Sequence, residues 1–358
     1  MKKEFPALSG KEIIILYDYI EKFGDEAEIE LNKQLLKQLQ NEIKELGFKS
    51  HLVSIKDDMY GPLKKFDPDK VVVFNWCEQF GDTPKTYHVI PYELDQMGFY
   101  YTGCGHDALL LTQDKIATKE VMVKGKVPTP VYKVYKRAGK FLNGWHFFPS
   151  IVKPESEHSS YGITKESVVD DHEQLTSQIN YVLKNYEGGA LVEQFINGTE
   201  YMVSVWGNTT EDIEVLPLLE LNFDEIKDYH NKIYSYNAKW DSSSMEFSAI
   251  VPLCPAPVDK ETETRIKDAA KLAYLKTGCF GYARIDIRVE NGFPYVVDVN
   301  ANPDMTAESE FVTSAAALGY NYGGTILKLC EIALNNPKLI NRNVDVGISL
   351  DPSIEKEA

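Results

Sequence analysis

The sequence contains few cysteines and lacks any long hydrophobic segment. Its five cysteines are odd in number and lie far apart in the chain. This spacing fits neither a disulfide framework nor a zinc site, so we expect reduced thiols. The apolar run near the N-terminus, Ile13 to Leu16, is much shorter than a signal peptide or a membrane span requires. We therefore expect a cytoplasmic protein with no membrane partner.

Positive charge is also scarce. The 358 residues include 38 Lys and Arg against 54 Asp and Glu, which gives a net charge of −16, and no stretch is rich in basic residues. A nucleic-acid backbone requires a concentrated basic surface, so nucleic acid is not an expected partner. A nucleotide is still compatible, because a few lysines and a divalent cation can reverse the potential inside a cleft. The seven histidines show neither metal-ligand nor triad spacing.

A chain of this length is expected to form two or three domains. The first hundred residues alternate strands at 13–16, 51–55 and 71–74 with a helix at 29–47, a pattern typical of a Rossmann-like parallel sheet. From Asp114 onward, helices and short strands mix without this alternation. We therefore predict the combined class α/β and α+β. The predicted domains are 1–112, 113–194 and 195–358, the last ending in an acidic tail.

The most informative segment is a predicted β-hairpin, with strands at 282–289 and 295–300 and a turn around Asn291-Gly292. Side chains alternate along a strand, so polar residues two positions apart share a face. Each strand carries one such pair: Arg284 with Asp286, and Asp298 with Asn300.

The length of the turn decides whether these pairs meet. A three-residue loop, 291–293, would place Asp286 opposite Asp298 and Arg284 opposite Asn300. A two-residue loop would put the two pairs on opposite faces of the sheet and would leave no site.

Two carboxylates that face each other repel unless a cation lies between them. Carboxylate and amide oxygens are ligands that Mg²⁺ accepts when it also holds phosphates, and an arginine beside them suits an anionic transition state. A solvated hairpin with scattered charges is the alternative interpretation of the same residues.

The hairpin and the segment after it resemble the D-alanine:D-alanine ligases of the ATP-grasp superfamily. The matching motifs, in the same order and spacing, are GYARID at 281–286 and VDVNANPDMT at 297–306, and the resemblance covers roughly residues 90–335. It implies an ATP-grasp fold behind the Rossmann-like domain. It also implies that Asp286, Asp298 and Asn300 hold two Mg²⁺ ions, or Mn²⁺, against ATP, and that Arg284 stabilises the tetrahedral oxyanion.

The resemblance extends upstream to lysine-containing and glycine-containing segments. It assigns Lys115 and Lys153 to the phosphates of ATP, and Ser159 and Ser160 of the segment SSYGI to a loop that closes over them. Lys239, in YNAKW at 236–240, would bind the acyl phosphate. The implied catalytic residues are Arg284, Ser160 and Lys239. Outside this context, such pieces are usually turns or exposed loop residues.

Adenosine binding is implied for the segment EQFI at 193–196. In the family, Glu193 and the backbone at Phe195 and Ile196 would contact adenine, and Glu200 would take the ribose hydroxyls. The alternative is that the apolar members of this segment belong to the core of a strand.

The substrate half departs from the family pattern. The family's acid after the first strand is replaced by Tyr17-Asp18-Tyr19, which leaves Glu28 (or Glu26) at the start of the first helix as a substitute, although helix N-termini favour acids in any case. Asp304 stands where the ligases have an oxyanion-hole glycine. Ser309 either binds the carboxylate of the second substrate or begins a helix. The candidate substrate contacts are Glu28, Glu220, Asp304 and Ser309.

We therefore expect an ATP-dependent ligase that joins a small-molecule carboxylate to an amine through an acyl phosphate. It would act on an amino acid or a small metabolite and release ADP and phosphate. Two alternatives stay open: a D-alanine:D-alanine ligase proper, and an ATP-binding protein without catalysis. The resemblance alone also predicts a homodimer.

Overall fold

The computed structural model describes residues 4–19, 25–83, 85–137, 139, 144–155, 157, 160–235, 238, 244 and 248–340. The chain forms two units. The first contains the residues up to Thr102 together with the segment from Ile326, and the second runs from Gly103 to Thr325. The three-domain division predicted from the sequence stays a prediction beside this division into two.

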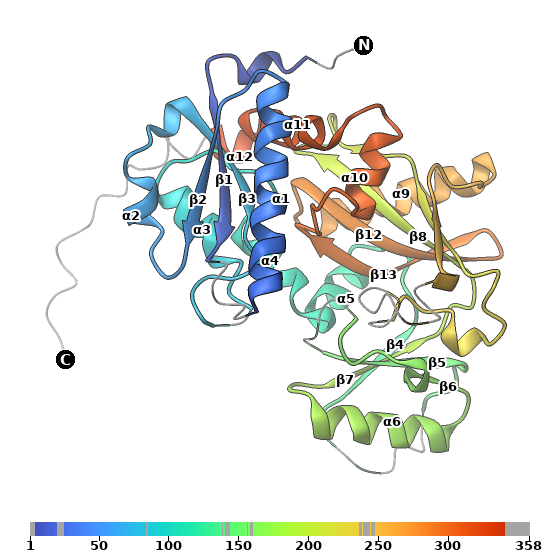
Figure 1. Ribbon diagram of the computed structural model, residues 1–358. Coiled ribbons are helices and arrows are strands. Elements are labelled where there is room, and N and C mark those ends of the chain that lie inside the picture. The colour runs from blue at the N-terminus through green and yellow to red at the C-terminus, as the bar shows by residue number, and fades with distance from the viewer. Residues whose placement is uncertain are drawn as a thin grey trace, which may run out of the picture. The chain divides into compact units, whose positions relative to one another are not determined.

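The first unit is built on a parallel sheet with the strand order β2-β1-β3 (Figure 1). The strands are β1 (Glu12–Asp18), β2 (Ser50–Ile55) and β3 (Val71–Trp76), which confirms the three strands predicted from the sequence. The apolar runs of β1 and β3 are buried on both faces, as parallel strands usually are.

Helix α1 (Glu26–Glu45) lies along this sheet (Figure 1). Asp25 caps the N-terminus of α1 by accepting hydrogen bonds from the N–H groups of Ala27 and Glu28. The helix buries one apolar face, which contains Leu36, Leu39 and Ile43. The remaining elements of this unit are η1 (Pro6–Leu8), α2 (Tyr60–Leu63), η3 (Pro68–Lys70), α3 (Val89–Gln96) and α12 (Pro337–Ile340).

The second unit contains two sheets. The four-stranded sheet, with the order β4-β7-β5-β6, is formed by β4 (Tyr132–Tyr135), β5 (Ser150–Pro154), β6 (Val168–Val169) and β7 (Ala190–Gln194), and α6 (His172–Asn185) packs against it (Figure 1). The other sheet has the order β11-β10-β8-β12-β13, and β9 also pairs with β8. Its strands are β8 (Thr199–Gly207), β9 (Glu214–Val215), β10 (Leu219–Asn222), β11 (Val251–Leu253), β12 (Gly281–Glu290) and β13 (Phe293–Ala301).

Helices complete the second unit. Helix α9 (Lys260–Lys276) packs on β12 and β13 and buries the face formed by Ile266, Ala269, Ala270 and Ala273. The other helical elements are α4 (His106–Thr112), α5 (Lys115–Lys124), η4 (Lys165–Ser167), η5 (Tyr229–Asn231) and α10 (Glu310–Ala316). Helix α11 (Tyr322–Leu334) contains the point at which the chain returns to the first unit. Among the helices described, none is both long and apolar enough to span a membrane.

The turn of the β12–β13 hairpin is shorter than the site was expected to require. Glu290 pairs with Phe293, so the loop contains only Asn291 and Gly292, both at positive φ as a type I′ turn requires. The expectation that a two-residue loop would abolish the site is wrong, because the pairing shifts by one residue farther along the hairpin.

That shift is a β-bulge at Val297. Ile287 pairs with Val296, but the next pair is Asp286 with Asp298, so Val297 is the extra residue on β13. The bulge moves Asp298 to the face of the sheet that carries Asp286, and Arg284 then pairs with Asn300. The two polar pairs therefore lie on one face of the sheet, in the same pairing that a three-residue loop was expected to produce.

Candidate active site

A cavity that opens to solvent lies in the second unit, lined by residues from both of its sheets. Its empty space is about 820 Å³ when the solvent at its mouth is included. Several of the residues singled out in the sequence line it, together with apolar side chains. The lining includes Lys115, Lys153, Ser160, Glu193, Phe195, Ile196, Glu200, Asp286, Asp298 and Asn300. Its apolar part includes Ile151, Ile163, Ile233 and Val297. A cavity with an apolar part and a few converging charged groups is typical of a ligand site.

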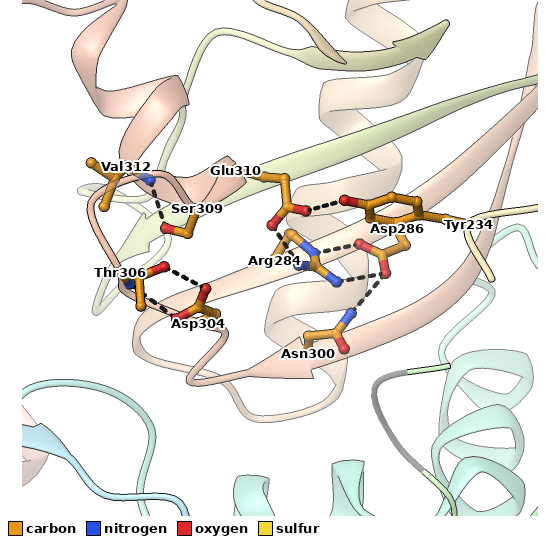
Figure 2. Close-up of polar contacts among 9 residues, drawn as sticks. All are labelled: Tyr234, Arg284, Asp286, Asn300, Asp304, Thr306, Ser309, Glu310 and Val312. Atoms are coloured by element: carbon orange, nitrogen blue, oxygen red, sulfur yellow. Dashed lines mark hydrogen bonds and ion pairs between the residues drawn. The ribbon is translucent and has the colours of Figure 1, made fainter. Parts of the chain in front are cut away.

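Asp286, Asp298 and Asn300 line one side of this cavity. Together with Arg284, which is bonded to Asp286, and Glu310, which is bonded to Arg284, they form what we call the hairpin cluster. Arg284 donates two hydrogen bonds to Asp286, from Nε to Oδ1 at 2.8 Å and from Nη2 to Oδ2 at 3.1 Å (Figure 2). Its Nη1 atom donates to Oε2 of Glu310 at 3.0 Å. Burial lowers the pKa of Arg284, but Asp286 and Glu310 outweigh this effect and raise the pKa overall, so the guanidinium stays charged.

The hairpin cluster fits a divalent cation. Asn300 donates from its amide nitrogen to Asp286 at 2.9 Å, so its amide oxygen is the atom available for a metal (Figure 2). Asp286 and Asp298 are direct neighbours across β12 and β13, where two carboxylates repel each other. Arg284 already binds Asp286, and the charges of Lys115 and Lys153 act on Asp298, so a divalent cation would add to a placement that is partly balanced. The described residues contain no group of three or more His, Cys, Asp or Glu side chains placed to hold a metal. The donor set here is two carboxylates and one amide, as Mg²⁺ accepts when phosphates complete its shell.

A second group of charges consists of three lysines and one glutamate, which we call the lysine cluster: Lys115, Lys119, Lys153 and Glu193. Lys115, Lys153 and Glu193 line the cavity, and Lys119 lies behind them against Glu193. Glu193 is 1% exposed and forms ion pairs with Lys119 and, at 2.6 Å, with Lys153. Burial raises the pKa of Glu193, but the two lysines outweigh this and the net shift is downward. Burial lowers the pKa of Lys119 and of Lys115. For Lys153 burial acts in the same direction, but Glu193 reverses it and the pKa rises.

Glu193 therefore has a different environment from the one implied for an adenine contact. Its carboxylate is occupied by lysines, and the N–H of Phe195 donates to the carbonyl of Pro149 at 2.9 Å. The carbonyl of Ile196 accepts a hydrogen bond from Arg288 at 2.9 Å. These groups line the cavity, but part of their hydrogen-bonding capacity is used within the protein.

Glu200, the implied ribose ligand, forms a buried ion pair with Arg288. The guanidinium donates from Nε at 3.0 Å and from Nη2 at 2.7 Å to the same carboxylate oxygen, and it lies 4.8 Å from the centre of the Phe195 ring. The second carboxylate oxygen of Glu200 is left for a ligand.

Ser160 lies at the cavity, whereas two other predicted residues lie outside the described part of the chain. Its backbone has a positive φ of 62°, and its hydroxyl donates to the carbonyl of Tyr234 at 2.7 Å. Ser159 and Lys239 are not among the described residues.

Glu220 does not share the face of the hairpin cluster. It pairs with Tyr201 on β8, whereas the site face of β8 carries Glu200, Met202 and Ser204, which oppose residues of β12. Residues directly opposite each other lie on one face of a sheet, so Glu220 points to the other face. Burial raises the pKa of its carboxyl group there. Glu220, a candidate substrate contact from the sequence, thus lies on the face opposite the hairpin cluster, and its contact with a substrate stays a prediction.

The other three candidate substrate residues have local structural roles. Ser309 caps α10 by accepting a hydrogen bond from the N–H of Val312 at 3.4 Å, and Asp304 accepts two bonds from Thr306 in an exposed turn (Figure 2). Glu28 is exposed in the first turn of α1, in the first unit. Their contacts with a substrate stay predictions.

Comparison with known proteins decides the family. A family model described as "D-ala D-ala ligase C-terminus" matches residues 127–331, more than half of the chain. The chain belongs to the D-Ala-D-Ala ligase family. A D-alanine–D-alanine ligase of Haemophilus influenzae is 31% identical over 318 residues, which cover 87% of this chain and 99% of the relative. An uncharacterized protein of Sinorhizobium fredii is 29% identical over 265 residues, 73% of this chain and 74% of that protein.

Solved structures agree in fold. A D-alanine–D-alanine ligase from Bacillus anthracis complexed with ATP has a TM-score of 0.63 at 20% identity, and the match covers 91% of this chain and 98% of that one. The predicted ATP-grasp fold of class α/β is confirmed. As a member of the D-Ala-D-Ala ligase family, the protein is an ATP-dependent ligase that forms a carbon–nitrogen bond between a carboxylate and an amine.

Three residues of this ligase's cavity region were missed by the sequence reasoning. Arg288 could have been found, because it continues the alternation of Arg284 and Asp286 along β12. Lys119 received no role from the sequence, since nothing local shows that it meets Glu193 across the fold. No sequence pattern indicates a role for Glu310, because its contact with Arg284 depends on how α10 is placed over the sheet.

Proposed function

We propose that this ligase uses ATP and Mg²⁺ to join an amino acid or small carboxylate metabolite to an amine, and that it releases ADP and phosphate. The observation that carries the proposal is the bulge that gathers Asp286, Asp298 and Asn300 beside Arg284, on a cavity that the lysine cluster also borders. Family membership supports the ligase class. The amino acid or metabolite is the part that we propose.

Different residues of the cavity would bind the phosphates, the ribose and the adenine of ATP. Lys115 and Lys153 line the cavity and would neutralise the phosphates, while Glu200 would accept a bond from a ribose hydroxyl through its second oxygen. Ile151, Ile163 and Ile233 would cover the adenine ring. Asp286, Asp298 and Asn300 would hold Mg²⁺, which would supply neutralisation of the phosphate charge.

In the first step, a carboxylate oxygen of the substrate attacks the γ-phosphorus of ATP. The bond to the bridging oxygen breaks, ADP leaves, and an acyl phosphate forms. Phosphoryl transfer depends mainly on positioning and on charge neutralisation, so the step needs no nucleophilic serine or cysteine. Ser160 would contribute by holding its loop against the segment at Tyr234.

In the second step, the amine nitrogen attacks the acyl carbon. The carbonyl oxygen takes the negative charge, phosphate leaves with the electrons of its bond to carbon, and the nitrogen loses a proton to give the amide. Arg284 would stabilise the oxyanion with the N–H groups that Asp286 and Glu310 do not use. Its raised pKa keeps it a donor throughout.

A screen of phosphate release tests this function. The purified chain is incubated with ATP, Mg²⁺ and pairs of amino acids, including D-alanine alone, and products are identified by mass spectrometry. We expect release that depends on both substrates, with an amide product. Release with D-alanine alone would favour the D-alanine:D-alanine alternative, and no release above an ATP-only blank for any carboxylate and amine pair would refute the proposal.

A further inference from the structure

The bulge that creates the hairpin cluster is clamped from outside the hairpin. Val296, the residue before the bulge, donates its N–H to the carbonyl of Pro128 at 2.8 Å. Its carbonyl accepts a hydrogen bond from the hydroxyl of Thr129 at 2.7 Å. Both polar groups of one peptide residue are thus tied to the segment that follows α5, which lies more than 160 positions earlier in the chain.

Thr129 is itself held by a buried lysine. The ammonium group of Lys119 donates to the Thr129 hydroxyl oxygen at 2.6 Å, and it also pairs with Glu193 of β7. Lys119 is 2% exposed, so it cannot exchange these partners for water without a large desolvation cost. The Thr129 hydroxyl therefore has its oxygen occupied by Lys119 and its proton directed to Val296.

The clamp acts where the pairing register is least determined. A bulge interrupts the ladder, and a shift of one residue in a strand reverses which face each side chain occupies. Without the bulge, Asp286 would pair with Val297, and Asp298 would point away from the hairpin cluster. Fixing Val296 fixes the start of the bulge and thereby the direction of Asp298.

We propose that Thr129, held by Lys119, is a positioning residue that keeps the Asp298 carboxylate in place for the divalent cation. This inference rests on the proposed function, because it uses the assignment of Asp298 as a metal ligand. Thr129 touches neither the nucleotide nor the metal in this proposal; it acts through the backbone of Val296. The same contacts also connect Glu193, and through it Lys153, to the metal-binding hairpin.

Binding of Mn²⁺ in the presence of ATP, measured by the loss of the free-ion signal in electron paramagnetic resonance, tests the inference without product formation. Thr129→Val keeps the shape and removes the hydroxyl, and we expect it to weaken Mn²⁺ binding by about 10-fold, the lower end of the effect of losing an outer-shell partner. Thr129→Ser, which keeps the hydroxyl, is expected to stay within about twofold of the native affinity. The Mg²⁺ concentration for half-maximal rate should rise in parallel, with the KM for ATP nearly unchanged.

Thr176→Val is the matched control. Thr176 is also partly buried, and its hydroxyl also donates to a backbone carbonyl at 2.7 Å, but within α6, away from the hairpin. It is expected to lower the melting temperature without changing Mn²⁺ affinity. Should Thr129→Val not fold, Thr129→Ala is measured in its place, with the same expectation.

The outcomes separate the inference from the function on which it rests. Native Mn²⁺ affinity in the Thr129 variants would overturn the positioning role while leaving the metal site in place, and so would equal weakening by the Thr176 control. If the native protein with ATP bound no Mn²⁺, this result would refute the metal assignment in the proposed function. It would also refute the positioning role of Thr129, which depends on that assignment.

Discussion

Two charged clusters border the same cavity with opposite imbalances of charge. The lysine cluster has three cations for one anion, whereas the hairpin cluster has three carboxylates for one guanidinium. In the lysine cluster the single glutamate is fully shared, so removing it would leave buried cations without compensation. In the hairpin cluster Asp286 and Glu310 share Arg284, and a divalent cation would further stabilise the direct opposition of Asp286 and Asp298.

The difference indicates what each border is built to receive. An excess of ammonium groups suits the triphosphate, and an excess of carboxylates suits the metal that accompanies it. The clusters are also joined, because Lys119 contacts both Glu193 and the threonine that clamps the hairpin. Substitutions in the two clusters should therefore fail in different ways, one in folding and the other in metal-dependent rate.

Removing the only carboxylate of the lysine cluster should have the largest effect. Glu193→Gln leaves Lys119 and Lys153 buried without their counter-ion, and we expect the free energy of unfolding in urea to fall by about 3–5 kcal/mol. Glu290→Gln, at the partly exposed end of β12, is the charge-matched control and should change stability little. The double variant Glu193→Gln/Lys119→Met should recover part of the loss. A Glu193 variant of native stability would contradict the picture of a cluster balanced by one anion.

Removing one carboxylate of the hairpin cluster should instead spare folding and stop the reaction. Asp298→Asn keeps the size of the side chain but reduces the charge that holds the cation, and we expect kcat to fall by more than about 100-fold, beyond the loss of an outer-shell partner. Relief of repulsion with Asp286 should leave the melting temperature equal or raise it. A variant that retains turnover, or one that unfolds, would remove the contrast between the clusters.

The sequence was sufficient for much of the fold and for the members of the hairpin cluster. Periodicity and turn residues located the parallel strands, α1 and the hairpin, because each depends on local spacing. The bulge at Val297 was not predictable, since its neighbour Val296 forms hydrogen bonds with Pro128 and Thr129 of a distant segment, which no local pattern shows. For the same reason, the lysine partners of Glu193 and the face of Glu220 became visible only from the packing of strands.

A smaller effect is expected at the contact between Tyr234 and Glu310. The phenol donates to Oε1 of Glu310 at 3.2 Å, and burial together with Glu310 raises the pKa of Tyr234, so it stays a donor across the neutral range (Figure 2). Tyr234→Phe frees Glu310 to compete more strongly for Arg284, and we expect kcat to fall by about 3- to 10-fold, which corresponds to the net value of one typical hydrogen bond. Tyr181→Phe, an exposed tyrosine on α6, is the control. Equal rates in the two variants would show that the contact of Tyr234 with Glu310 does not affect how Arg284 acts in the reaction.

The smallest effect should come from a third, more exposed set of charges, at His230. Its ring contacts Asp228 through Nδ1 at 2.7 Å and Asp170 through Nε2 at 2.9 Å, with side chains that are 26%, 56% and 42% exposed in that order. Burial lowers the pKa of His230, but the hydrogen bonds that its ring donates to Asp228 and Asp170 outweigh this effect and raise the pKa overall.

Because the folded pKa of His230 is raised, its contribution to stability is complete below the unfolded value of about 6.5 and disappears as the pH rises through the folded value. His230→Gln should therefore lower the melting temperature by no more than about 3 °C near pH 5.5 and by almost nothing near pH 8.5, since exposed ion pairs contribute little. Differential scanning calorimetry at the two pH values measures this. A loss as large as that of Glu193→Gln would mean that burial is not what separates this set of charges from the two clusters of the cavity.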